Sequence, residues 1–254
     1  MKKIKILWYP AILLLLASLV GCQQKRYAIT DIRTSRIEID ASWEEKTNPQ
    51  MQELADSYKS ALGSQMDVEI GTAVRTMKKG RPQSLLGNFT ADALKQKAEE
   101  LWGDIDFAIV NTGGLRSTLN KGSVSVGNLY EIYSFDNALV LLELPASETN
   151  KFFKHIASVG GQAISNNIEM VVDGRKLSSL KIGGRELDPN KTYRVATIDY
   201  LAEGNDGMTA FKKASKRIDS GITLRDIMIE HVKKLTAENK EIDAKLDNRI
   251  TLNP

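Results

Sequence analysis

The residues best suited to chemistry stand where a largely apolar run, residues 105–110, ends in the sequence Asn-Thr-Gly-Gly-Leu-Arg. Asn111 offers a hydrogen-bond donor and an acceptor, and Arg116 brings a planar, permanent charge that suits a carboxylate, a phosphate or a flat ring. Gly113 and Gly114 leave room for a ligand beside the main chain. A ligand site of an α/β protein often begins this way. The spacing also fits an ordinary strand-to-helix turn with a surface arginine, because it matches neither GxGxxG nor a P-loop.

Two aromatic residues and a carboxylate are candidates to complete such a site. Phe135 lies in a polar loop just before an apolar strand, and Tyr200 lies just past another strand. Two aromatic rings on loops can hold a flat base between them, which is worth about 1–3 kcal/mol per base. Asp206, in a Gly-Asn-Asp-Gly turn, has acceptors for sugar hydroxyls. Taken singly, each aromatic also fits the edge of a core, and Asn-Asp-Gly is a common turn signal.

The helices and strands that must position these residues are predicted from hydrophobic periodicity and from the Gly, Pro and Asn residues that mark their ends. The consecutive strands near the C-terminus argue against a purely alternating doubly wound sheet. We therefore predict an α+β fold with a mixed β-sheet flanked by helices. The predicted helices are 48–63, 84–102, 128–132, 145–159 and 223–237, and the predicted strands are 32–39, 68–76, 105–110, 138–144, 168–172, 177–182, 193–198 and 249–252. Helix 48–63 would gather Met51, Leu54, Ala55, Tyr58 and Leu62 on one apolar face.

The N-terminus has the pattern of an export signal. A basic start, Lys2-Lys-Ile-Lys5, precedes the apolar run 6–20, which is short for a spanning helix. Leu19-Val-Gly-Cys22 resembles the lipobox of bacterial lipoproteins. We expect a signal peptide over residues 1–21, a lipidated tether and edge segment over 22–42, and anchoring of the protein to a membrane of the bacterial cell envelope through Cys22. An uncleaved anchor with an incidental thiol is the alternative.

Charge and cysteine content narrow the classes of function. Cys22 is the only cysteine, so no disulfide can form within one molecule. Removal of residues 1–21 takes away three lysines and no acid, which lowers the formal charge from +3 to 0. A neutral protein with interspersed charges lacks the basic surface that a nucleic-acid backbone requires. We therefore expect no nucleic-acid partner.

Four motifs in register carry a family resemblance: Gly87-Asn-Phe-Thr-Ala-Asp-Ala93, Asn111-Thr-Gly-Gly-Leu-Arg116, Phe135 and Tyr200-Leu-Ala-Glu-Gly-Asn-Asp-Gly207. Together they resemble the C-terminal, substrate-binding domain of the 5′-nucleotidase/UDP-sugar hydrolase family. The resemblance runs from about residue 68 to the C-terminus and implies a nucleoside-binding domain over residues 43–254.

The resemblance also implies roles for individual residues. Phe135 and Tyr200 would sandwich the base, and Asp206 would bind hydroxyls. Asn111, Gly113, Gly114 and Arg116 would serve the ribose and the phosphate. Arg81 would supply a further arginine ahead of the Gly-Asn helix, although Pro82 follows it and Leu85 stands where the family usually has Asn.

The chain departs from the family in its metal chemistry. Family enzymes carry an N-terminal metallophosphatase domain with clustered His, Asp and Asn ligands. The whole chain has two histidines, His155 and His231, both in predicted helices and without ligand spacing. We expect no catalytic residue, metal site or cofactor in this chain, and divalent metals only in a partner. The sequence thus suggests the nucleotide-binding half of a split 5′-nucleotidase that works with a separate metallophosphoesterase chain.

Three other functions are compatible with the sequence. The first is a non-enzymatic surface lipoprotein that binds nucleotides or nucleosides. The second is a structural or adhesive role in which the motif residues serve only as turns. The third is an independent hydrolase with an unrecognised site.

Overall fold

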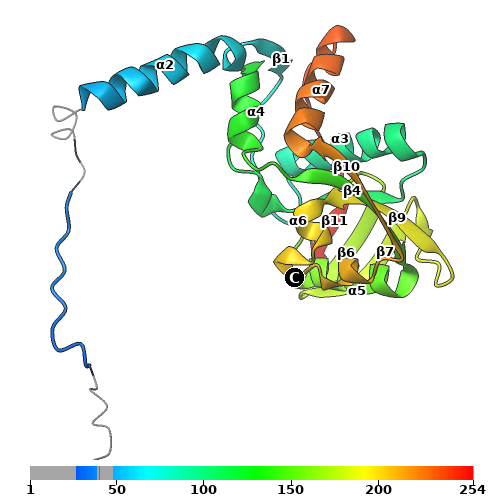
Figure 1. Cartoon of the computed structure of the whole chain (residues 1–254). Coiled ribbons are helices and arrows are strands. Elements are labelled where there is room, and N and C mark those ends of the chain that lie inside the picture. Colours follow the sequence, from blue (N-terminus) through cyan, green and yellow to red (C-terminus); the bar gives the residue numbers. More distant parts are fainter. Residues whose placement is uncertain (1–26, 39, 41–47, 254) are drawn as a thin grey trace, which may run out of the picture. The chain divides into compact units, whose positions relative to one another are not determined.

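The computed structural model describes residues 27–38, 40 and 48–253 (Figure 1). The chain divides into two units, residues 1–52 and 53–254, with the boundary inside helix α2, Pro49–Met66. The predicted signal peptide and Cys22 lie outside the described residues. No helix in the described part of the chain is long and apolar enough to cross a membrane.

The predicted edge strand at 32–39 is wrong for residues 32–38, and residue 39 lies outside the described residues. Residues 27–38 carry neither helix nor strand, and Ile32 and Ile37 are exposed. An alternating sequence forms a strand only where a neighbouring strand accepts and donates its backbone hydrogen bonds. In the part of the chain that the structure describes, no such partner is present for these residues.

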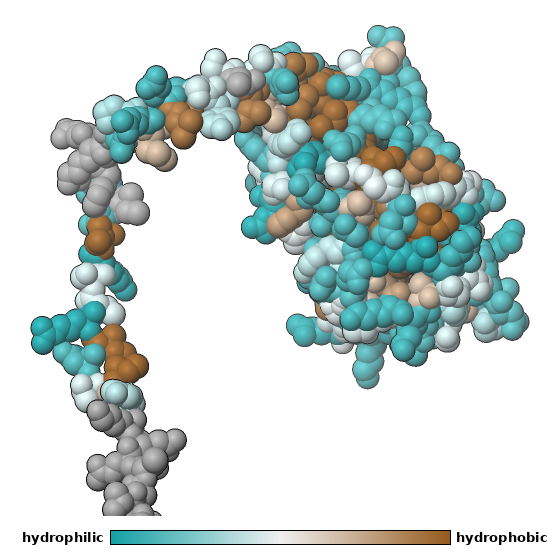
Figure 2. Space-filling view, in the orientation of Figure 1, coloured by the Kyte–Doolittle hydropathy of each residue, from teal (hydrophilic) through white to brown (hydrophobic). Residues whose placement is uncertain are grey.

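Helix α2 begins as predicted and runs past its predicted end. Gly63 does not stop the helix, because its carbonyl oxygen accepts a bond from the Asp67 N–H at 2.9 Å. The predicted apolar face does form along one side of the helix, but its large side chains are at least half exposed. These are Met51, Leu54, Tyr58 and Leu62. Figure 2 shows hydrophobic residues on the surface of this helix.

The central sheet is mixed, as predicted. Its five strands lie in the order β10 (Lys216–Thr223), β4 (Ala138–Pro145), β9 (Thr192–Ile198), β2 (Phe107–Val110) and β5 (Ala163–Ile164). Only the β2 and β9 pair is parallel; the other pairs are antiparallel. All four residues of β2 are buried, which matches the apolar run in the sequence. Strand β2 therefore belongs to the core, and the segment that begins at Asn111 follows directly from it.

Two smaller sheets accompany the central one. One has the order β11 (Ile250–Asn253), β6 (Ile168–Asp173), β7 (Lys176–Ile182) and β8 (Arg185–Glu186). The other pairs β1 (Glu69–Ala73) with β3 (Gly122–Ser125). Sequence periodicity misses β3, β5, β8 and β10, because the first three have at most four residues and β10 is a charged strand at the edge of the sheet.

Helices cover the sheets. They are α3 (Leu85–Trp102), α4 (Val126–Ile132), α5 (Ala146–Ser158), α6 (Asp199–Ala202) and α7 (Leu224–Ala237) (Figure 1). The side chains of Ser84, Ser125 and Thr223 accept backbone N–H bonds at the starts of α3, α4 and α7, which fixes where these helices begin. Helix α3 packs against β2 and β5, and α5 packs against β4 and β7.

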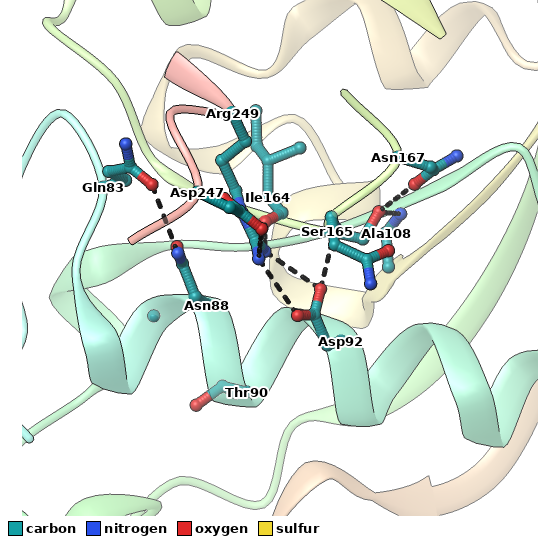
Figure 3. Close-up of polar contacts among 12 residues, drawn as sticks. Gln83, Asn88, Thr90, Asp92, Ala108, Ile164, Ser165, Asn167, Asp247 and Arg249 are labelled. Atoms are coloured by element: carbon teal, nitrogen blue, oxygen red, sulfur yellow. Dashed lines mark hydrogen bonds and ion pairs between the residues drawn. The ribbon is translucent and has the colours of Figure 1, made fainter. Parts of the chain in front are cut away.

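A buried arginine ties α3 to the C-terminal segment. Arg249 is 3% exposed and donates to both carboxylate oxygens of Asp92, to both of Asp247 and to the Ile164 carbonyl oxygen (Figure 3). Burial raises the pKa of Asp92 despite its bonds to Arg249. Burial also acts upward on the pKa of Asp247, but the hydrogen bond and charge of Arg249 outweigh it and lower that pKa. These contacts use every N–H group of the guanidinium.

Candidate functional site

A cavity of about 400 Å³ gathers seven of the eight predicted binding residues. Its walls come from the segment after β2, the loop before β4, and the segment from α6 onward. The lining residues are Asn111, Gly113, Gly114, Arg116, Phe135, Asn137, Tyr200 and Asp206. A cavity of this size suits a small organic ligand. The structure therefore brings together residues up to 95 positions apart in the chain.

The floor of the cavity is the short turn that follows β2. Residues Thr112–Gly114 form one 3₁₀ turn, in which the Gly114 N–H donates to the Asn111 carbonyl oxygen at 3.0 Å. A Cβ atom on Gly114 would lie 2.7 Å from the Asn111 Oδ1 atom. Gly114 is therefore needed because the Asn111 amide occupies that space. The Gln162 Oε1 atom accepts from the Thr112 N–H at 2.8 Å and fixes the start of the turn.

The carboxylate of Asp206 is the centre of the polar side of the cavity. The Asn111 Nδ2 atom donates to its Oδ2 atom at 2.7 Å, and the Tyr200 hydroxyl donates to its Oδ1 atom at 2.9 Å. Because the Asn111 Nδ2 atom donates to Asp206, the Oδ1 atom of the same amide lies on the side of Gly114. This buried oxygen has no hydrogen-bond partner among the described residues. Buried acceptors are nearly always paired in proteins. Because this oxygen is shielded beside Gly114, the acceptor that the cavity offers to a ligand hydroxyl or amine is the exposed Asp206 carboxylate, which has lone pairs left.

The aromatic side of the cavity is open to solvent. The Phe135 side chain is 50% exposed and that of Tyr200 is 39% exposed, so both rings can receive a flat ligand without leaving a packed core. The Arg116 guanidinium carbon lies 5.8 Å from the Phe135 ring centroid. The hydrogen bond to Asp206 and the charge of that carboxylate raise the pKa of the Tyr200 hydroxyl, which therefore stays a donor.

Arg81 stands apart from the other predicted residues. It does not line this cavity, and its Nη1 atom donates to the Val159 carbonyl oxygen at 2.8 Å. Its role in substrate binding stays a prediction.

Sequence reasoning missed two residues at the site. Asn137 lines the cavity, and nothing in its local sequence separates it from an ordinary loop residue. The sequence indicates a plain helix residue at His155 of α5, yet its Nε2 atom lies 2.9 Å from the Asp206 carbonyl oxygen. The other histidine packs on the ring of Phe89, and burial lowers the pKa of His231. Among the residues that the structure describes, no group of three or more His, Cys, Asp and Glu side chains could hold a metal ion.

Fold and site together define a known class of domain. Residues 63–213 match the family model for the 5′-nucleotidase C-terminal domain, and the chain belongs to this family. This result confirms the family predicted from the four motifs, and with it the α+β class.

The relatives are longer proteins. Protein UshA of Yersinia enterocolitica is 27% identical over 191 residues, which are 74% of this chain and 35% of UshA. The trifunctional nucleotide phosphoesterase protein YfkN of Bacillus subtilis is 28% identical over 236 residues, 85% of this chain and 16% of YfkN. The solved structure of a 5′-nucleotidase precursor from Thermus thermophilus is 26% identical with a TM-score of 0.70, covering 80% of this chain and 43% of that one. The chain spans about a third of the length of the UshA protein that it matches.

Proposed function

We propose that this chain binds a nucleoside or nucleotide in the cavity at the end of β2 and positions it for phosphate-ester hydrolysis by a separate metallophosphatase. One observation carries the proposal: Phe135, Tyr200 and Arg116 line the same cavity as a carboxylate that is held by Asn111. The aromatic rings would take the base, and the exposed Asp206 carboxylate would take the sugar hydroxyls. Arg116 would meet the charged end of the ligand.

The division of labour is supported by the lengths of the relatives. The matched domain is a C-terminal domain by name, and UshA carries about two thirds of its length outside the aligned part. In this proposal the metal chemistry, with divalent ions that activate water and polarise the phosphate, belongs to a partner chain. This chain would contribute binding energy and orientation. A lipid at Cys22 would hold it at the bacterial cell envelope.

A purely binding role is the second candidate. The residues of this chain that line the cavity already include two aromatic rings, an arginine and a carboxylate. A surface lipoprotein that captures nucleosides would use the same contacts without any hydrolysis. The two candidates differ in one measurable respect, which is the effect of a metallophosphatase.

Calorimetric titration of the full chain with adenosine and with AMP tests the binding. We expect Tyr200→Ala to weaken binding at least tenfold, a loss of about 1.4 kcal/mol. The matched control is Tyr58→Ala, which removes an exposed tyrosine of α2 that does not line the cavity and should leave the affinity unchanged. No binding up to millimolar ligand, or equal losses in both variants, would contradict the proposed pocket.

Phosphate release from AMP tests the split enzyme. The chain should be mixed with a metallophosphatase that has no nucleotide-binding domain, in the presence of Mn²⁺, and compared with each protein alone. Faster release by the mixture, abolished by Tyr200→Ala, supports positioning by this chain. An unchanged rate together with intact nucleoside binding favours the binding lipoprotein.

A further inference from the structure

The loop that carries Asp206 adopts a conformation that is costly for its backbone. Asp206 has φ 52°, in the left-handed region, between Gly204 at 84° and Gly207 at 78°. For a residue with a side chain this region costs about 1 kcal/mol. Asp is among the residues that tolerate this region, and contacts from outside the loop add to what holds Asp206 there.

One such contact comes from α5, behind the cavity. The His155 Nε2 atom lies 2.9 Å from the Asp206 carbonyl oxygen. Because a carbonyl oxygen only accepts, Nε2 must carry the hydrogen and donate it. The helix itself is anchored by Phe152 and Phe153, which are at most 1% exposed. The imidazole therefore connects a rigid part of the core to the backbone of the loop.

Close packing accompanies this hydrogen bond. A Cβ atom on Gly207 would lie 2.5 Å from the His155 Cε1 atom and 2.8 Å from Nε2. Any side chain at position 207 would push the ring and the loop apart. Gly207 is thus required both by its positive φ and by the approach of His155.

We infer that His155 is a positioning residue for the Asp206 carboxylate and thereby for recognition of ligand hydroxyls. His155 fixes the backbone of Asp206, while Asn111 and Tyr200 fix its two carboxylate oxygens. The inference rests on the proposed nucleoside binding and adds a residue that does not line the cavity. Loss of His155 should impair hydroxyl recognition and spare the stacking of the base.

The test compares the affinity for adenosine with that for 2′,3′-dideoxyadenosine, measured by competition on the full chain. The wild type should prefer adenosine. In His155→Ala we expect the adenosine affinity to fall about fivefold, the effect of one hydrogen bond, while that for the dideoxy compound stays the same. Gln can place a donor near the position of Nε2, so His155→Gln should restore most of the preference. Lys154→Ala, an exposed neighbour on the same helix, is the matched control and should behave as wild type.

Gly207→Ala tests the same inference without replacing His155, because the added methyl group would push the imidazole ring away from the loop. Thermal unfolding of each variant checks that it is folded, and Gly207→Ala with His155→Gln decides the matter if His155→Ala unfolds. Equal losses for both ligands, no loss for either, no rescue by Gln, or a wild type without preference would overturn the inference. If Tyr200→Ala weakens binding while the His155 and Gly207 variants bind as wild type, the inference alone fails. If the wild type does not bind adenosine, the proposed function fails and the inference with it.

Discussion

Two polar clusters in the unit 53–254 differ in how their hydrogen bonds are satisfied. At Arg249, every N–H of a buried guanidinium donates to an oxygen of the same chain. At Asp206, each carboxylate oxygen accepts one bond, from Asn111 and from Tyr200, but the residue is exposed and has lone pairs left for a ligand. The first cluster is closed, and the second keeps an acceptor and two exposed aromatic rings beside a cavity.

This difference separates a structural cluster from a binding site. A saturated buried network has no capacity left for a ligand, and its removal leaves charges unpaired inside the protein. An unsaturated cluster at a cavity keeps some of its donors or acceptors free to bind a ligand. Substitutions at Arg249 should therefore change stability, and substitutions at the cavity should change affinity.

The largest effect is expected at Arg249. Arg249→Met removes the charge and keeps an apolar chain, which leaves Asp92 and the Ile164 carbonyl oxygen without their partner. We expect the free energy of unfolding to fall by about 3 kcal/mol, measured by urea denaturation. A change below about 1 kcal/mol would show that water replaces the arginine and that the cluster is not closed.

Phe135→Ala should lower ligand affinity and leave stability nearly unchanged, the reverse of the effect expected at Arg249. Its ring is half exposed, so the free energy of unfolding should change by about 0.5 kcal/mol or less. Adenosine affinity should fall about tenfold, because one face of the base sandwich is lost. Calorimetric titration and urea denaturation on the same sample give both numbers. A large loss of stability with unchanged affinity would remove the distinction between the two clusters.

The two carboxylates around Arg249 should respond to acid in opposite directions. The pKa of Asp247 is lowered, so its contribution to stability is present above the ordinary value near 3.8 and is lost as pH falls through the folded pKa. The pKa of Asp92 is raised, so its contribution is present at low pH and is lost as pH rises through the folded pKa. The loss of unfolding free energy between about pH 6 and about pH 3 should therefore be larger in Asp92→Asn than in Asp247→Asn. Urea denaturation at both pH values measures it, and the reverse order would contradict these pKa shifts.

The smallest effect is expected at Arg217, which resembles Arg249 in its number of acidic partners but not in burial. It also pairs with two acids, Glu203 and Asp219, yet a third of its side chain is exposed. Arg217→Met should change the free energy of unfolding by about 0.5 kcal/mol or less, because solvent screens exposed ion pairs. It serves as the matched control for Arg249→Met. A loss as large as that at Arg249 would mean that burial does not decide the value of these arginines.

Local sequence was sufficient for much of the fold. Helices α3 and α7 begin at the serine and the threonine that the sequence indicates, because an N-cap needs only residues within one turn. The apolar run before Asn111 forms a fully buried strand, since a strand whose residues are all apolar is expected to be buried on both faces. Family motifs also identified seven residues of the cavity, since such motifs depend only on the order of residues along the chain.

Local sequence was insufficient where a partner distant in the chain decides the outcome. Residues 32–38 alternate like a strand but have no neighbouring strand in the described part of the chain, whereas the charged strand β10 pairs with β4 despite its composition. The apolar face of α2 follows from periodicity, but periodicity says nothing about whether that face is covered.

By itself, the sequence determined the family, the α+β class and the identities of most residues at the cavity, because motifs and periodicity are local properties of the chain. Only the tertiary structure decided that Asn111 bonds Asp206, that His155 holds the loop and that Arg249 is closed by Asp92. These partners lie 95, 51 and 157 positions apart. Hydrogen bonds over such separations depend on how the whole core packs, and no local pattern specifies them.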